Sequence, residues 1–204
     1  NFIGMHFFSP VERMPLVEII RGRKTSPQTL ARALDLVQAM KKTPIVVNDG
    51  PGFFTSRFIG AYINESLAMV TEGVNPALIE NAAKMAGIPV GPLTVSDEIG
   101  LDTAYHASQQ RKKDEGAAFK PTPTFGLVEK LVGELGRHGR KNGKGFFEYA
   151  EDGSKKLWSG LAELFPPLPE QPTVDEVKAR MLYAQLVDAA KAMAEGVLID
   201  PADG

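Results

Sequence analysis

The sequence predicts an α/β segment followed by a mainly α-helical domain. Three short apolar runs, at 2–8, 16–22 and 43–49, are rich in aromatic and β-branched residues and have the pattern of buried strands. Apolar residues at helical spacing fill 26–42, and from residue 50 onward most of the chain has that spacing too. A strand, a helix and a strand form the last part of an α/β unit. We therefore expect its earlier strands upstream of this chain.

The first two strands are expected to run antiparallel. Their connection, from Ser9 to Pro15, is too short for the crossover of about a dozen residues that parallel strands need. The helix that follows them has a clear start, because Ser26 is a natural N-cap and Pro27 suits the first turn.

The helical part begins with 50–73, whose apolar face is wide enough to be buried on most sides and which Gly73 ends. Further elements are expected as helices at 75–86, 93–114 and 124–136, a strand at 143–149 with 155–158 as its candidate partner, a Pro-rich connector at 166–173 and a last helix at 174–195. The expected domains are the end of the α/β domain at 1–49, a helical domain at 50–149, a linker at 150–173, and a last helical segment at 174–204.

The last helix resembles the first long one. Residues 57–74 align without gaps to 180–197, and both segments begin with Arg and end in Glu-Gly-Val. Two unrelated amphipathic helices would share part of this similarity, because both must present apolar faces. The shared ends favour a duplication, so we expect 174–204 to start a second copy of the helical domain. Since the chain also begins inside a strand, we expect it to be a piece of a longer protein.

Composition excludes several classes of function. The net charge is −2, and no dense basic stripe supports binding to nucleic acid. The absence of cysteine excludes disulfides, thiolate metal sites and cysteine nucleophiles. No apolar run approaches the roughly 20 residues of a transmembrane span. His106 and His138 have no partners at metal-ligand spacing, so no metal site is expected.

His6 and Glu18 lie in the first two predicted strands and are the first candidates for chemistry. An imidazole can take a proton from an alcohol near neutral pH, and a carboxylate on its other nitrogen fixes the tautomer and stabilises the imidazolium. Neighbouring short strands can bring the two side chains within hydrogen-bond reach. The alternative is a half-buried His and an edge Glu with no mutual contact, and spacing alone leaves both open.

Four ordered motifs carry a wider resemblance. They read GMHFFSPVERMPLVEII, VVNDGPGFFTSR, GIPVGPLTVSDEIGLD and GRKNGKGFFEY. In this order and spacing, the chain resembles the 3-hydroxyacyl-CoA dehydrogenase family over nearly its whole length. The resemblance implies the edge of a Rossmann-type NAD-binding domain, then a helical domain like that of 6-phosphogluconate dehydrogenase. The tail is similar to the α subunit of multifunctional fatty-acid oxidation complexes, which implies an upstream enoyl-CoA hydratase and a thiolase β-subunit or homo-oligomeric partner.

The resemblance also implies roles for particular residues. His6 is the implied general base and Glu18 its partner in oxidation of an acyl-CoA substrate, 3-hydroxyacyl-CoA, with NAD. Ser9 stands where the family often has Asn near the nicotinamide, and Ser56 where it often has Asn at the substrate carbonyl. A serine has shorter reach and no amide fork, which weakens both roles. Lys141 matches a lysine that approaches the cofactor, with a solvated basic turn as the alternative.

The chain contains no G-x-G-x-x-G loop after a strand, the usual site for a dinucleotide pyrophosphate. We therefore expect this piece alone neither to bind NAD tightly nor to turn over. Two alternatives stay open: a non-catalytic association module, and another β-hydroxyacid dehydrogenase. The other β-hydroxyacid dehydrogenases typically use a lysine on the first long helix, and residues 50–73 contain no lysine. The expected location is the bacterial cytoplasm, or the mitochondrial matrix in a eukaryote.

Overall fold

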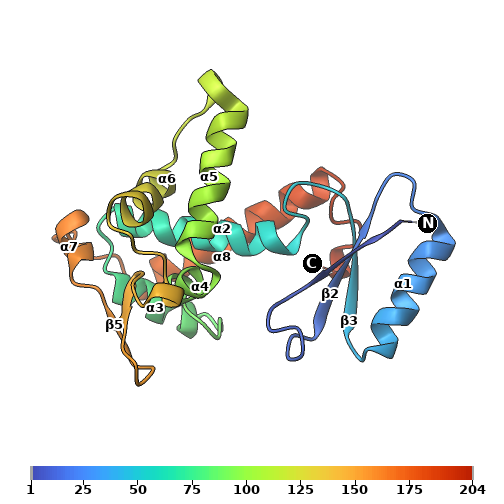
Figure 1. Cartoon of the computed structure of the whole chain (residues 1–204), viewed down its shortest axis with the longest axis horizontal. Coiled ribbons are helices and arrows are strands. Elements are labelled where there is room, and N and C mark those ends of the chain that lie inside the picture. The colour runs from blue at the N-terminus through green and yellow to red at the C-terminus, as the bar shows by residue number, and fades with distance from the viewer. Residues whose placement is uncertain (1, 204) are drawn as a thin grey trace. The chain divides into compact units, whose positions relative to one another are not determined.

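The computed structural model describes residues 2–203 (Figure 1). These residues form two compact units. The first, the sheet unit, holds the residues up to Ala61 together with those from Ala184 onward. The second, the helical unit, holds Tyr62–Tyr183.

The sheet unit contains a three-stranded sheet in the order β1 (Gly4–Phe7), β2 (Leu16–Arg21) and β3 (Thr43–Asn48). β1 runs antiparallel to β2, which confirms the prediction, and β2 runs parallel to β3. The parallel pair is joined by α1 (Pro27–Ala39), as a crossover requires. Its predicted N-cap is confirmed, because Ser26 Oγ accepts a hydrogen bond from the amide of Thr29 at 3.2 Å.

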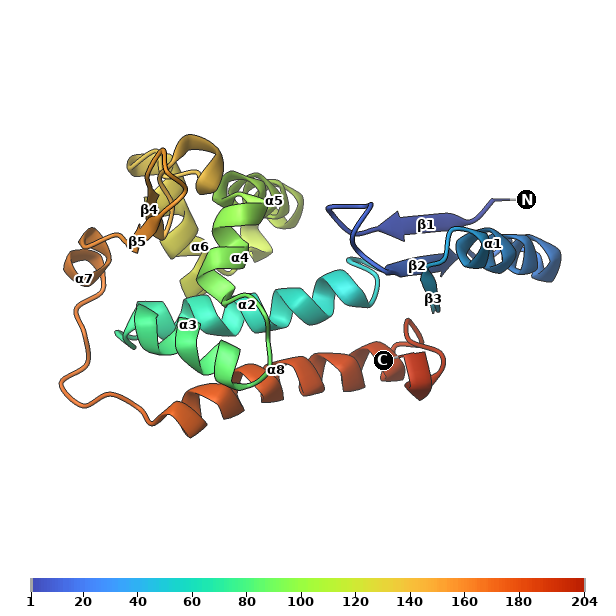
Figure 2. The same ribbon diagram turned by 90° about the horizontal axis from the view of Figure 1, so that it is seen from below.

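α1 covers one face of this sheet (Figure 2). Val17 and Ile19 of β2 are fully buried in an apolar cluster with residues of α1. Since side chains alternate along a strand, Glu18 and Ile20 point to the opposite face. Ile20 packs there with Phe54 and apolar residues near the end of the chain. Glu18 therefore points to the face of the sheet on which this second apolar cluster lies.

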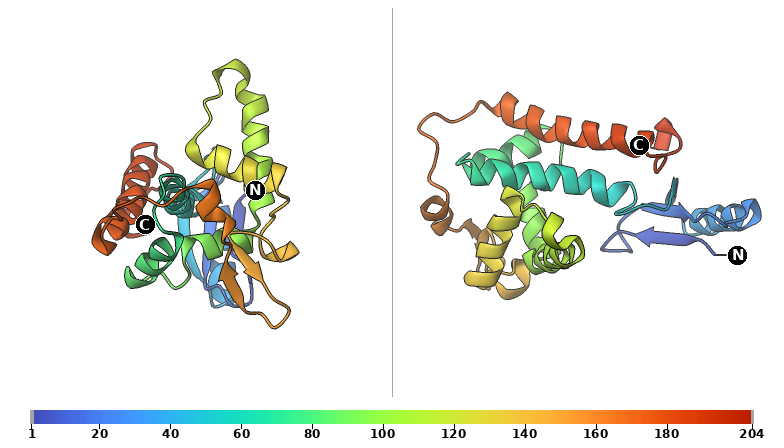
Figure 3. Two further views of the ribbon diagram at one scale, coloured as in Figure 1. Left: turned by 90° about the vertical axis from the view of Figure 1, so that its left-hand side faces the viewer. Right: turned by 90° about the horizontal axis from the view of Figure 1, so that it is seen from above.

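Helices dominate the chain after β3. They are α2 (Thr55–Thr71), α3 (Pro76–Met85), α4 (Pro92–Ile99), α5 (Leu101–Glu115), α6 (Pro123–Val128), α7 (Gly160–Leu164) and α8 (Val174–Ala194), with shorter helical turns at Gly116–Ala118, Glu129–Glu134, Arg140–Asn142 and Pro201–Asp203. β4 (Phe147–Tyr149) and β5 (Lys155–Leu157) form an antiparallel hairpin, as expected (Figure 3). Within the helical unit these elements share one apolar core, whose fully buried members include Met69, Ile79, Leu131, Phe146 and Met181.

Three expectations need correction. The predicted helix at 93–114 is two helices, because Gly100 between α4 and α5 has φ of +98°, a conformation that glycine adopts far more readily than other residues. The predicted helix at 124–136 continues beyond α6 only as a π-helical turn. The segment 150–173, expected as a linker, contains the short helix α7 in addition to the strand expected at 155–158.

α2 and α8 run side by side (Figures 2 and 3). In the sheet unit, Arg57 at the start of α2 makes a bidentate contact with Asp188 of α8, with Nε–Oδ2 at 3.0 Å and Nη2–Oδ1 at 3.1 Å. The same guanidinium donates to Glu195 at 2.5 Å. A fork-shaped donor facing two carboxylates gives a strong and directional ion pair.

A second cluster in the helical unit repeats this arrangement. Arg180 of α8 donates to Glu65 at 2.7 Å and to Glu72 at 2.9 Å. In the gapless alignment of the two helices, Arg180 stands opposite Arg57, and its two partners stand opposite the two partners of Arg57. The two ion-pair clusters are therefore reciprocal. Within residues 2–203, no helix is both long and apolar enough to cross a membrane.

Candidate active site

His6 and Glu18 are in contact. They are directly opposite each other in the antiparallel β1–β2 pair, so their side chains emerge on the same face of the sheet. The distance between His6 Nδ1 and Glu18 Oε2 is 2.9 Å. The reading in which these residues have no mutual contact is therefore wrong.

Glu18 is completely buried, and the start of α2 surrounds its carboxylate with donors. Oε1 accepts from the backbone amides of Phe54 at 2.9 Å and Thr55 at 3.1 Å. Oε2 accepts from the Thr55 hydroxyl at 2.7 Å. Amides at a helix N-terminus have no partner within the helix, and they carry the positive end of the helix dipole. These three hydrogen bonds therefore fix the orientation of the carboxylate.

The His6 ring is held between aromatic side chains. Its centroid lies 4.5 Å from that of Phe8 and 6.0 Å from that of Phe53. The side chain remains 29% exposed, whereas Glu18 is fully enclosed. Because the carboxylate accepts at Nδ1, the neutral ring carries its hydrogen there and leaves Nε2 as an acceptor. An acceptor nitrogen on a partly exposed imidazole is the group that a general base needs.

The other predicted site residues have different surroundings. Ser9 lies in an exposed bend just after β1, and Ser56 is the exposed second residue of α2. Both belong to the sheet unit, as the His6–Glu18 pair does. Lys141 belongs to the helical unit, where its ammonium pairs with Asp102. That hydrogen bond lowers the pKa of Asp102.

Thr55 was missed by the sequence reasoning. Its hydroxyl and its amide both bind Glu18, and its side chain is buried. A signal was available, because a Thr at the start of a helix is well suited to hydrogen bonding around the helix N-terminus. The signal does not reveal the partner, since Glu18 lies 37 residues earlier.

Glu80 shows what a buried carboxylate does at a helix start when no imidazole is present. It accepts from the amides of Leu93 at 2.7 Å and Thr94 at 3.0 Å, and from the Thr94 hydroxyl at 2.7 Å. This repeats the pattern of Glu18 with the start of α2. The difference is that Glu18 also contacts the imidazole of His6.

Asp97 is a further buried carboxylate with a structural role. It accepts from the amides of Phe146 at 2.8 Å and Phe147 at 3.0 Å, and from the hydroxyl of Tyr149 at 3.0 Å. Burial raises the pKa of Asp97, and these hydrogen bonds partly offset that rise. Asp97 thus ties α4 to β4. No group of three or more His, Asp or Glu side chains within the described residues is arranged to hold a metal ion.

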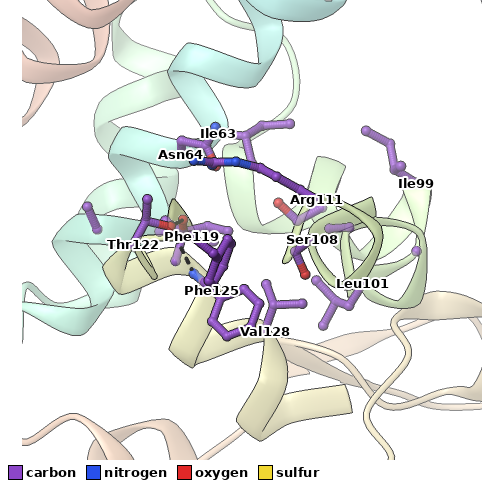
Figure 4. Close-up of a pocket in the computed structure, with 16 residues that line it drawn as sticks. Ile63, Asn64, Ile99, Leu101, Ser108, Arg111, Phe119, Thr122, Phe125 and Val128 are labelled. Atoms are coloured by element: carbon purple, nitrogen blue, oxygen red, sulfur yellow. Dashed lines mark hydrogen bonds between the residues drawn. The ribbon is translucent and has the colours of Figure 1, made fainter. Parts of the chain in front are cut away.

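The helical unit also contains a cavity of about 400 Å³ between α2, α4, α5 and α6 (Figure 4). Apolar side chains form most of its wall, among them Ile63, Leu67, Leu101, Phe125 and Val128. Figure 4 shows Arg111 extending from α5 toward Asn64 of α2.

Comparisons with known proteins agree with these features. Residues 1–50 match the family model described as the 3-hydroxyacyl-CoA dehydrogenase NAD binding domain, and residues 52–149 match that of the C-terminal domain of the same enzymes. The fatty acid oxidation complex subunit alpha of Shewanella loihica is 39% identical over 208 residues, which cover 100% of this chain and 29% of that protein. The chain thus spans less than a third of the curated relatives it matches.

Solved structures give the same result. The dehydrogenase part of multifunctional enzyme 1 from C. elegans matches with a TM-score of 0.73 and 30% identity, over 98% of this chain and 46% of that one. (S)-3-Hydroxybutyryl-CoA dehydrogenase from Ralstonia eutropha matches with a TM-score of 0.63 and 37% identity, over 74% of this chain and 53% of that one. Two matching domain models in the expected order, together with a His–Glu pair held by a helix start, identify the chain: it belongs to the 3-hydroxyacyl-CoA dehydrogenase family of oxidoreductases.

Proposed function

We propose that this chain is part of an NAD-dependent L-3-hydroxyacyl-CoA dehydrogenase of fatty-acid β-oxidation, within a longer polypeptide. The observation that carries the proposal is the 2.9 Å contact between His6 and Glu18, together with the donors that α2 directs at Glu18. The family membership and the relatives named fatty acid oxidation complex subunit alpha support the same reaction.

In this proposal His6 is the general base. Its Nε2 takes the proton of the substrate 3-hydroxyl as the hydride leaves C3, and a 3-ketoacyl-CoA results. The imidazolium that forms donates from Nδ1 to Glu18, whose charge offsets the new positive charge. The interaction between the two residues is stronger in the transition state than in the ground state, so it lowers the barrier.

NAD, when bound, supplies the acceptor for that hydride. The residues of this chain fit the reacting end of such a site, because a partly exposed imidazole stands beside a buried carboxylate. We propose Ser9 and Lys141 as further cofactor contacts and Ser56 as a substrate contact, each through the single hydrogen-bonding group of a short hydroxyl or an ammonium. The chain has no glycine-rich phosphate loop, so we expect weak NAD binding and no turnover by the 204 residues alone.

We also propose that residues 174–204 begin a second copy of the helical domain. The reciprocal ion pairs of Arg57 and Arg180 support this, because aligned positions make the same contacts. Exposed apolar residues of α8 support it further. Leu186 is 60% exposed, whereas its aligned counterpart in α2, Ile63, packs against the apolar core of the helical unit. In a second copy, α8 would have equivalent helices to cover it.

The setting of the whole protein belongs to the same proposal. The names of the relatives favour a fatty-acid oxidation complex, with an enoyl-CoA hydratase on the same polypeptide and a thiolase β-subunit or a second copy as partner. Because those relatives are bacterial, we propose the bacterial cytoplasm as the location, with the mitochondrial matrix for a eukaryotic source.

The decisive experiment follows NADH formation from an L-3-hydroxyacyl-CoA by the full-length parent protein. Glu18→Gln puts an amide NH₂ group where the carboxylate accepted, so we expect kcat to fall by about 10²–10⁴-fold with the fold retained. Unchanged turnover would make Glu18 structural. A wild-type protein without activity would favour the association module, and NADH formation by the isolated chain would contradict the expected need for upstream residues.

A further inference from the structure

We propose that Phe53 is a positioning residue for the proposed reaction. Its ring holds the imidazole of His6 in the orientation in which Nδ1 meets Glu18, so that Nε2 is the nitrogen left for the substrate proton. This inference rests on the proposed function and deepens it, because it adds a residue to the same site. All three residues belong to the sheet unit.

The backbone of Phe53 has an unusual conformation. Its φ is +50°, in the left-handed region where a side chain crowds the backbone. Within the described residues, Lys41 at φ +57° is the other non-glycine residue in this region. Lys41 directly follows Met40, the C-cap of α1, and a left-handed residue is common there. Phe53 precedes a helix instead, so its strain points to a role for its side chain.

The turn before α2 serves both members of the His–Glu pair. The amide of Phe53 donates to the carbonyl of Gly50 at 3.0 Å, which closes the turn. The next amide, that of Phe54, donates to Glu18 Oε1 at 2.9 Å. The same turn brings the ring of Phe53 to His6, with the ring centroids 6.0 Å apart. One backbone conformation therefore supports the carboxylate and contacts the imidazole.

Two aromatic rings contact the imidazole of His6. The centroid of Phe8 lies 4.5 Å away with the ring planes at 47°, and the plane of Phe53 is inclined at 52° to the imidazole. Aromatic pairs favour tilted geometries of this kind. Phe8 comes from the same segment as His6, whereas Phe53 comes from the turn before α2. Contacts from two different segments restrict the imidazole more than either contact alone.

Phe53 is itself held in place by packing. It is half-buried and packs against the apolar cluster that contains Phe54 and Val197. A side chain fixed in this way can act as a wall for its neighbour, because its own rotamer is restricted. Phe58 packs against the same cluster, but its ring contact is with Phe54, at a centroid distance of 5.7 Å. Phe58 is therefore a matched control for loss of an aromatic ring from this cluster.

The first test measures NADH formation from an L-3-hydroxyacyl-CoA by the full-length parent protein. Phe53→Leu keeps an apolar side chain but removes the flat ring. We expect kcat to fall about tenfold with KM for the acyl-CoA unchanged, because a misplacement of 1 Å at a reacting group can cost about 10²-fold. Phe53→Tyr keeps the ring and should restore kcat. Phe58→Leu should leave kcat unchanged, and an equal fall in this control would overturn the proposal.

A second measurement does not depend on turnover. Diethyl pyrocarbonate acylates accessible unprotonated imidazoles, and mass spectrometry of the peptide that contains His6 gives the rate at this residue. Phe53→Leu should raise that rate, because one of the two rings beside the imidazole is gone, and Phe58→Leu should not. If the wild-type parent forms no NADH, the proposed function fails, and this rate still decides whether Phe53 holds His6.

A further variant guards against misfolding of Phe53→Leu. Phe53→Gly removes the ring and suits the left-handed backbone, which glycine adopts readily. It should lower kcat and raise the acylation rate of His6 as Phe53→Leu does. Lys41→Gly relieves the same kind of strain outside the site and should change neither quantity. Wild-type kcat and a wild-type acylation rate in Phe53→Gly would overturn the proposal and leave the proposed function intact.

Discussion

Thr55 donates its hydroxyl hydrogen bond to the same oxygen of Glu18 that contacts His6. The Oγ1–Oε2 distance is 2.7 Å, and the His6 Nδ1 atom lies 2.9 Å from that oxygen. Thr55 is thus linked to the imidazole through the carboxylate, and in the proposed mechanism it is a positioning residue. Hydrogen bonds of this kind, from a neighbouring residue to the partner of a catalytic group, fix the orientation of that group.

Thr55→Val removes this hydroxyl while keeping the shape of the side chain. We expect the free energy of unfolding to fall by about 1.5–3 kcal/mol, since a hydrogen bond to a buried charged group is lost. We expect kcat to fall roughly tenfold with KM unchanged, because Glu18 is less well oriented toward His6. Urea unfolding and steady-state kinetics of the parent protein measure the two effects. Thr55→Ser should restore kcat, and a Val variant with wild-type kcat would limit Thr55 to capping α2.

Gly91 lies against the carboxylate of Glu80, and hydrogen bonds from the start of α4 hold that carboxylate in place. A Cβ at position 91 would lie 2.3 Å from Glu80 Oε2, and three hydrogen bonds keep that carboxylate in place. Gly91→Ala should therefore destabilise the fold by about 2–3 kcal/mol. Gly126→Ala is the control, because a Cβ there meets nothing within 4 Å. A urea midpoint that Gly91→Ala leaves unmoved would mean that Glu80 can shift freely.

The ion pairs of Arg57 and Arg180 should differ in strength. The Arg57 and Asp188 side chains are 17% and 20% exposed, whereas Arg180 and Glu65 are 36% and 30% exposed. Solvent weakens the second pair more, so double-mutant cycles should give a coupling of about 1 kcal/mol for the first pair and about 0.5 kcal/mol for the second. The first cycle combines Arg57→Gln with Asp188→Asn, and the second combines Arg180→Gln with Glu65→Gln. Urea unfolding measures the free energy of unfolding of each variant. A coupling energy of zero for both ion pairs would mean that they do not stabilise the packing of α2 against α8.

The same clusters predict sensitivity to acid. The hydrogen bond from Arg180 lowers the pKa of Glu72, and that from Arg57 lowers the pKa of Glu195, both from an ordinary value of 4.5. A carboxyl whose pKa is lower in the folded state contributes stability above its unfolded pKa and loses it as the pH falls through the folded pKa. The chain should therefore lose stability below pH 4.5. The double variant Glu72→Gln, Glu195→Gln should show a shallower loss in urea midpoints between neutral pH and about pH 3, and an identical slope would contradict this assignment.

The sequence by itself determined the elements whose signals are local. The Ser26 N-cap, the short connection that makes β1 and β2 antiparallel, the β4–β5 hairpin and the end of α2 at Gly73 are all present in the structure. These features depend on a few neighbouring residues, for which side-chain hydrogen bonding, chain length and backbone freedom are decisive.

Only the tertiary structure decided whether His6 and Glu18 are in contact. Alternation along two strands permits their contact, but it does not reveal that Phe54 and Thr55, 36 and 37 residues after Glu18, would supply the donors that hold the carboxylate. The break at Gly100 and the cavity under α5 were hidden for the same reason. Periodicity reports which face of an element is buried, whereas the partner of a buried polar group is set by packing between segments far apart in the chain.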